Sequence, residues 1–123
     1  MKTEYSIEAW DETHPRWHEF LACLEAVAPE QAPFVLGEYY RTYQSYLLVA
    51  LQLNQVVGFI RFAVQPIGLE AKCPTLYLNG AQLTEAKIHA FAVREIARNQ
   101  GIGTELQRQT IYRAKALGCY QVA

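Results

Sequence analysis

One segment near the C-terminal end of the chain has residue types suited to binding a phosphate group. An expected strand ends at Val93, and a short turn with Arg98, Gly101 and Gly103 leads into an expected helix. The first turn of a helix has backbone N–H groups without partners and a partial positive charge, which attract an anion. Glycines let the backbone approach that anion, and Arg98 can add a charge-assisted hydrogen bond. The segment therefore predicts a pyrophosphate site.

Two common phosphate motifs describe this segment less well. The dinucleotide fingerprint needs Gly-x-Gly-x-x-Gly directly after a strand, but here the third position is Leu106 and Gly101 lies eight residues beyond Val93. A P-loop needs a lysine after its second glycine, and this segment has none. A Gly-x-Gly pair alone would also be compatible with a flexible start of a helix.

The run from Arg98 to Gly103 resembles motif A of the GNAT superfamily of N-acetyltransferases, [Arg/Gln]-x-x-Gly-x-[Gly/Ala], and its spacing from Val93 is also that of the family. The resemblance implies that acetyl-CoA is the co-substrate. It implies that backbone groups of Phe91, Ala92 and Val93 bind the pantetheine arm as an added strand would. It also implies that the pyrophosphate lies on the amides of Arg98, Asn99, Gln100, Gly101, Ile102, Gly103 and Thr104.

The sequence departs from the family pattern in three places. Glu95 stands where the family often has proline, and the segment Gln65–Lys87 is longer than the usual connection. The family also continues beyond Cys119–Ala123 with a helix and two strands, which carry a tyrosine that often protonates the leaving thiolate. We therefore expect a single domain, residues 1–123, that is C-terminally incomplete. An unfinished last strand favours a homodimer, and the alternative function is a non-catalytic CoA-binding or interaction module.

The expected reaction is attack of an amine, on a small molecule or a protein, on the thioester carbonyl. The resemblance implies that the backbone N–H of Val93 stabilises the oxyanion. Alternate residues of a strand share a face, so Glu85, Lys87, His89 and Phe91 are expected together. His89 titrates near neutral pH and Glu85 could act if buried, so both are candidate bases. The other reading is that both are ordinary groups on the sheet surface.

Two further clusters have a structural and a functional reading. A tyrosine cluster lies before the central hairpin: Tyr39, Tyr40, Tyr43 and Tyr46. The resemblance implies that this region lines the acceptor site, and the other reading is that the tyrosines pack on the sheet. His14 and His18 have the i, i+4 spacing of a metal pair on a helix. A third ligand is not apparent nearby, so we interpret them as surface histidines and expect no metal.

The elements that must position these groups follow from hydrophobic periodicity and turn residues. A first helix should carry one apolar face, with Pro15 near its start and Pro29 and Pro33 closing it. Asn79-Gly80 predicts a small hairpin within the otherwise irregular Glu70–Thr84. Gln52–Gln55 should connect an antiparallel pair. The expected strands are Tyr5–Trp10, Ser45–Leu51, Val56–Val64, Lys87–Val93 and Cys119–Ala123. The apolar face of the first helix should contain Trp17, Leu21, Leu24 and Ala28. The other two expected helices are Phe34–Tyr43 and Thr104–Leu117.

This order predicts an α/β chain with a GNAT-like mixed, mostly antiparallel sheet flanked by helices. The last two strands should be parallel because a crossover helix joins them. With 51% hydrophobic and 19% charged residues, the 123-residue chain has the composition of one ordered domain. A net charge of −1 without a basic stripe argues against nucleic acid, and no apolar run approaches the roughly 20 residues of a membrane span. The three scattered cysteines suggest free thiols and a cytoplasmic location.

Overall fold

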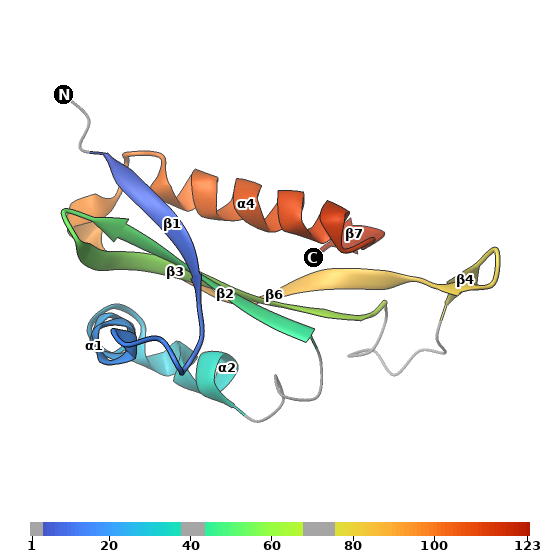
Figure 1. Ribbon diagram of the computed structural model, residues 1–123, viewed down its shortest axis with the longest axis horizontal. Coiled ribbons are helices and arrows are strands. Elements are labelled where there is room, and N and C mark those ends of the chain that lie inside the picture. Colours follow the sequence, from blue (N-terminus) through green and yellow to red (C-terminus); the bar gives the residue numbers. More distant parts are fainter. Residues whose placement is uncertain (1–3, 38–43, 68–75) are drawn as a thin grey trace.

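The computed structural model describes residues 4–37, 44–67 and 76–123. A five-stranded sheet lies between a layer containing α1 and α2 and a layer formed by α4 (Figure 1). The elements are β1 (Tyr5–Trp10), α1 (Trp17–Val27), the 3-10 turn η1 (Pro29–Gln31), α2 (Ala32–Leu36), β2 (Gln44–Gln52), β3 (Gln55–Pro66), β4 (Tyr77–Leu78), β5 (Ala81–Gln82), β6 (Thr84–Val93), the 3-10 turn η2 (Glu95–Ala97), α4 (Ile102–Ala116) and β7 (Gln121–Val122).

The strand order is β1-β2-β3-β6-β7, with every neighbouring pair antiparallel except β6 and β7, which are parallel. Strand β2, beside the central strand β3, is apolar over residues 47–51, where it is buried on both faces of the sheet. Its alternate side chains enter two separate clusters, Leu47 and Val49 on the α1 side and Leu48 and Ala50 on the α4 side. The predicted mixed sheet and its parallel strand–helix–strand unit are therefore confirmed.

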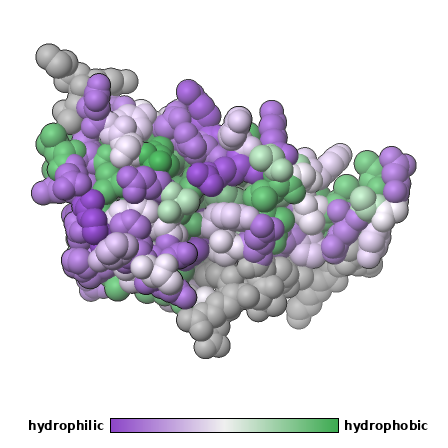
Figure 2. Space-filling view, viewed as in Figure 1, coloured by the Kyte–Doolittle hydropathy of each residue, from purple (hydrophilic) through white to green (hydrophobic). Residues whose placement is uncertain are grey.

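Both predicted hairpins are present, and the backbone conformation of their two-residue turns accounts for them. Leu53 and Asn54 have φ of 51° and 62°, and Asn79 and Gly80 have φ of 52° and 80°. Two consecutive residues with positive φ form the kind of two-residue turn that matches the twist of antiparallel strands. The β4–β5 hairpin projects beyond the sheet (Figure 1), and apolar side chains are exposed at that end of the molecule (Figure 2).

The N-terminal helices differ from their predicted bounds. Pro15 lies in the turn before α1, because the backbone N–H of Arg16 is held by Nδ1 of His14 at 3.0 Å and the helix begins at Trp17. Pro33 does not close α1 but lies in the first turn of α2. Helix α2 starts at Ala32, two residues before the predicted Phe34, and ends at Leu36. The rest of the predicted helix, with Tyr39, Tyr40 and Tyr43, lies outside the described residues.

The C-terminal half follows the prediction with small shifts. Strand β6 begins at Thr84 rather than Lys87, and α4 begins at Ile102 rather than Thr104. The buried stripe of α4 consists of Ile102, Leu106, Thr110 and Ala114, whereas Leu117 is exposed. Arg113, beside this stripe, is half-buried. Within residues 4–37, 44–67 and 76–123, no helix is long and apolar enough to cross a membrane.

Candidate active site

The residues expected to bind a coenzyme form one continuous junction between β6 and α4. Phe91, Ala92 and Val93 end the strand, and η2 follows. Asn99 (φ 64°) and Gly101 (φ 84°) then take left-handed conformations that turn the chain into the helix. Ile102, Gly103 and Thr104 form the first turn of α4, and Arg98, Asn99 and Gln100 complete the connecting loop.

The backbone at the start of α4 is ready to receive an anion. Gly101 occupies the N-cap position, where it supplies no side-chain hydrogen bond, and its carbonyl accepts the N–H of Glu105 at 2.9 Å. The N–H groups of Ile102, Gly103 and Thr104 have no acceptor among the described residues. Together with the helix dipole, these three donors are the groups that the expected anion site requires.

The loop before this helix is held in place from across the sheet. Nε2 of Gln52, at the end of β2, donates to Oε1 of Gln100 at 2.7 Å. This bond fixes the loop without using the backbone N–H groups that face outward. The start of α4 is thus already oriented by the protein's own contacts, and a preorganised site loses less conformational entropy on binding.

Gly103 has a second role that the sequence alone did not indicate. A Cβ added to Gly103 would meet Cζ of Phe91 at 3.2 Å and Cγ2 of Val93 at 3.8 Å. Glycine therefore lets α4 pack closely on the end of β6. The packing brings the free N–H groups of the helix next to the end of the strand, so one ligand could contact both.

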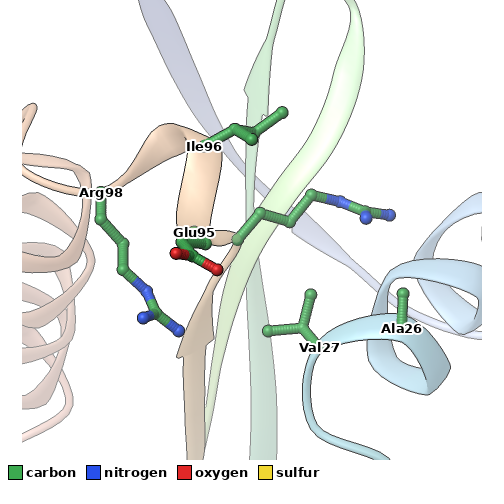
Figure 3. Close-up of a pocket in the computed structure, with 6 residues that line it drawn as sticks. Ala26, Val27, Glu95, Ile96 and Arg98 are labelled. Carbon is green, nitrogen blue, oxygen red and sulfur yellow. The ribbon is translucent and has the colours of Figure 1, made fainter.

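Arg98 turns back toward the strand. Its Nε donates to the carbonyl of Val93 at 3.1 Å, while the side chain as a whole is exposed. Figure 3 shows the guanidinium of Arg98 and the carboxylate of Glu95 beside the end of β6. They border a pocket of about 270 Å³ between this junction and the C-terminal end of α1, lined by Ala26, Val27, Arg94, Glu95, Ile96 and Arg98.

The last part of β6 has a free edge in the sense that no described strand pairs with it there. The N–H of Arg94 donates to the carbonyl of Val57 at 2.7 Å, and Val93 lies opposite Gly58. In an antiparallel pair this pattern makes Val93 and Phe91 non-hydrogen-bonded positions, so their N–H and C=O groups point away from β3. Strand β7 pairs with Glu85 and Ala86 at the other end of β6. The edge at Phe91 and Val93 can therefore take an extended, amide-containing ligand.

Gln31 already uses part of this edge. Its Oε1 accepts the N–H of Phe91 at 2.9 Å, and its Nε2 donates to the carbonyl of Phe91 at 3.3 Å. Sequence reasoning missed this residue, since the pair is 60 residues apart and no local pattern connects them. The only local signal is the placement of Gln31 between Pro29 and Pro33, where the chain must turn.

A β-bulge changes which residues of β6 share a face. Arg61 of β3 lies opposite Ala90 but Phe62 lies opposite Ile88, so His89 is the extra residue. Beyond the bulge Phe91 packs in the cluster facing α4, whereas Ala90 packs on the α1 side. The prediction that Glu85, Lys87, His89 and Phe91 share one face is therefore wrong for Phe91, because an extra residue reverses the alternation.

The two candidate bases have different surroundings. Glu85 is 6% exposed, and its carboxylate accepts hydrogen bonds from Nε2 of Gln65 at 3.2 Å and Nε2 of Gln121 at 2.9 Å. It lies six residues before Phe91, roughly 20 Å along the strand. His89 is half-buried in the bulge, only two residues from Phe91. The structure thus separates the two candidates, with His89 near the free edge and Glu85 far from it.

The metal reading of the histidines fails on geometry. His14 lies in the turn before α1, where its ring stacks on Trp10 with centroids 3.8 Å apart. It therefore does not share a helix with His18, so the helical i, i+4 arrangement on which the metal interpretation rested is not formed. Cys23 and Cys119 are free thiols, and burial raises the pKa of both.

Comparison with known proteins gives a family and a fold. The model of the acetyltransferase (GNAT) family matches residues 8–123. A ribosomal-protein-alanine N-acetyltransferase from Brucella melitensis biovar Abortus 2308 superposes with a TM-score of 0.69 at 16% identity, over 98% of this chain and 78% of that one. Glucosamine-6-phosphate N-acetyltransferase from Arabidopsis thaliana superposes with a TM-score of 0.66 at 15% identity, over 98% of this chain and 80% of that one.

An aminoglycoside N-acetyltransferase solved in complex with CoA gives a TM-score of 0.66 at 15% identity, over 100% of this chain and 77% of that one. At these identities the likeness concerns the fold. A search of curated proteins finds no match.

Proposed function

The chain belongs to the acetyltransferase (GNAT) family, and on that premise we propose that its β6–α4 junction binds acetyl-CoA for transfer of the acetyl group to an amine. The observation that carries this proposal is the meeting of the unpaired N–H groups at the start of α4 with a strand edge that is held only by side chains, those of Gln31 and Arg98. The unpaired N–H groups at the start of α4 lie beside this edge of β6, because the missing side chain of Gly103 lets the helix pack closely on Phe91. A diphosphate and an amide-containing arm are the two parts of CoA that such groups would bind.

The diphosphate would lie on the N–H groups of Ile102, Gly103 and Thr104. Arg98, in the loop before them, would contribute its terminal nitrogens, because only its Nε is bonded to the strand. A guanidinium near a phosphate makes strong charge-assisted hydrogen bonds. Asn99, Gln100 and Gly101 would shape the loop around the anion, with Gln100 anchored to Gln52.

The pantetheine arm would lie along the edge of β6. Of the three residues expected there, Phe91 and Val93 direct their backbone groups outward, whereas Ala92 directs its own toward β3. Bound acetyl-CoA supplies an activated acyl carbonyl to an amine nucleophile. The N–H of Val93, which has no acceptor among the described residues, is suited to hold the oxygen of that carbonyl as negative charge develops.

The amine must lose a proton during transfer, and His89 is the candidate base that we favour. It sits in the bulge two residues before Phe91, and an imidazole exchanges protons near neutral pH, directly or through a water. Glu85 is less suited, because it lies roughly 20 Å away along the strand and holds two glutamine amides. We assign it the role of joining β3, β6 and β7.

The acceptor would be an amine of a small molecule or a protein. The structurally similar enzymes named above act, by their names, on acceptors of both kinds: a ribosomal protein, a sugar phosphate and an aminoglycoside. If the diphosphate lies at the start of α4, the amine would approach from the opposite face of the sheet, which α1 and α2 cover.

A binding and turnover experiment tests the proposal. Titration calorimetry with acetyl-CoA should detect one site per chain, and a thiol-release assay with a panel of aminoglycosides, amino sugars and peptide N-termini should detect transfer. Binding without turnover would favour the alternative of a CoA-binding module. No binding of acetyl-CoA would reject the assigned site.

A further inference from the structure

The side chain of Gln31 pairs with the same strand edge that the proposed function gives to the pantetheine arm. A primary amide has one acceptor oxygen and a donor N–H₂, so it can bond both backbone groups of one residue at once. Gln31 does this with Phe91, at 2.9 Å for the accepted bond and 3.3 Å for the donated bond. Such pairing is what an additional strand, or the amide of an extended ligand, would make at this position.

The backbone of Gln31 is firmly held, whereas the pairing itself depends only on side-chain torsions. Gln31 ends η1, and its N–H donates to the carbonyl of Ala28 at 2.9 Å. Ala28 is 2% exposed, and Ala32, on the other side, packs against the cluster facing α1. Rotation of the Gln31 side chain would therefore free the edge without unfolding the α1–α2 segment.

Resting on the proposed function, we infer that Gln31 is an internal competitor of acetyl-CoA, which occupies Phe91 in the free protein and is displaced by the pantetheine arm. Each backbone group of Phe91 that Gln31 occupies is withdrawn from the ligand. The apparent affinity is then reduced by the fraction of molecules in which the edge is free. The pairing also shields an open strand edge from other chains while the ligand is absent.

The competition has a consequence for acceptor binding. Gln31 lies between α1 and α2, the helices on the face from which we expect the amine. When the pantetheine arm takes Phe91, the amide of Gln31 becomes available at that face. Arrival of the coenzyme would thus change the acceptor side of the site.

Titration calorimetry with two ligands tests this inference. Acetyl-CoA contacts both the start of α4 and the edge of β6, whereas 3′-phospho-ADP carries the diphosphate without the pantetheine arm. Gln31→Ala should bind acetyl-CoA roughly three- to tenfold more tightly, because two neutral hydrogen bonds no longer compete. Its affinity for 3′-phospho-ADP should stay as in the unmodified protein. Glu30→Ala, an exposed neighbour in the same turn, is the matched control and should change neither affinity.

Two outcomes can be told apart. If 3′-phospho-ADP and acetyl-CoA both bind but Gln31→Ala leaves the acetyl-CoA affinity unchanged or weaker, the competition is overturned and the coenzyme site stands. If neither ligand binds the unmodified protein, the proposed function fails. Gln31→Met keeps the length of the side chain and removes both hydrogen bonds, so it replaces the alanine variant if that one does not fold.

Amide hydrogen exchange gives an independent readout on the unmodified protein. The N–H groups of Phe91 and Val93 point to the same edge, but only Phe91 is bonded to Gln31. Without ligand, Phe91 should exchange more slowly than Val93, and in Gln31→Met the two should become similar. Equal exchange of both groups in the unmodified protein would overturn the inference.

Discussion

Thr104 offers the sharpest test of the anion site at the scale of a single residue. It is exposed and lies in the first turn of α4. A carboxylate in the first turn interacts favourably with the helix dipole, so Thr104→Glu should raise the free energy of unfolding by about 0.3–1 kcal/mol. The same charge would repel a diphosphate by about 1–2 kcal/mol, which is roughly five- to thirtyfold in affinity. Urea unfolding and calorimetry with acetyl-CoA measure the two effects.

Thr104→Gln, which has the same length without the charge, is the control and should retain most of the affinity. A gain in stability together with a loss of acetyl-CoA affinity in Thr104→Glu would distinguish a ligand site from general damage to the helix. If Thr104→Glu binds acetyl-CoA normally, the diphosphate does not lie at this helix.

Arg98 should contribute through its charge and through its fork of donors. Its Nε holds the carbonyl of Val93, which orients the terminal nitrogens. Arg98→Ala should weaken acetyl-CoA binding by about 1.5–3 kcal/mol, the range for a hydrogen bond to a charged group. Arg98→Lys keeps the charge but loses the forked pair of donors, so its affinity for acetyl-CoA should lie between those of the unmodified protein and Arg98→Ala. Equal affinities of all three proteins, measured by calorimetry, would remove Arg98 from the site.

At the scale of elements, the contact of α4 with β6 depends on the missing side chain of Gly103. An alanine would gain up to about 1 kcal/mol of helix propensity but force its Cβ against the ring of Phe91, which costs about 1–3 kcal/mol. Gly103→Ala should therefore lower stability. In a Phe91→Leu background the ring atom is absent, and Gly103→Ala should become neutral or stabilising. Urea unfolding of the four proteins measures this coupling, and an identical effect in both backgrounds would contradict the packing argument.

The two ends of β6 should separate structural from catalytic roles. Glu85→Ala leaves the amides of Gln65 and Gln121 without their shared acceptor and should cost about 1–3 kcal/mol of stability. Its kcat should change little. His89→Gln should instead lower kcat by roughly 10²–10⁴-fold if the imidazole accepts the proton of the amine. The thiol-release assay and urea unfolding check both variants, and the reverse pattern would make Glu85 the base.

How far the sequence predicts these elements depends on how local their signals are. The turns at Leu53-Asn54 and Asn79-Gly80 follow from neighbouring residues, and both were predicted. The bulge at His89 was not, because it depends on how β6 pairs with β3. The bond between Gln31 and Phe91 was missed for the same reason: contacts between distant segments leave no periodic pattern.

At the scale of the whole molecule, one sheet separates two hydrophobic clusters. The cluster facing α1 includes Phe20, Cys23 and Phe59, and the cluster facing α4 includes Phe62 and Leu106. Alternate residues of the same central strands enter both clusters. Loss of either helix layer would expose one face of those strands, so we expect the two layers to unfold together.

Alkylation of Cys23 can test whether the two helix layers unfold together. Its side chain is 0% exposed, and burial raises its pKa, so alkylation requires the protein to open. In a chain with Cys73→Ser and Cys119→Ser, saturating acetyl-CoA should slow alkylation of Cys23, although the proposed coenzyme site lies at α4. At a ligand concentration 100 times Kd, the expected slowing is about 100-fold, or about 2.7 kcal/mol. An unchanged rate would mean that α1 opens without disturbing the junction of β6 and α4.

The pH dependence of the same reaction follows from the direction of the pKa shift. Folding keeps the thiol of Cys23 neutral, so its contribution to stability is present below the ordinary thiol pKa of about 8.5 and is lost as pH rises through the raised native value. The opened chain reacts as the thiolate, so alkylation should accelerate about tenfold per pH unit up to roughly pH 8.5. Above that pH the thiol of the opened chain is already ionised. The alkylation rate should then rise further only because ionisation of Cys23 destabilises the fold. A rate that reaches a plateau below pH 7 would mean that Cys23 reacts from a cationic, exposed environment and not from the opened core.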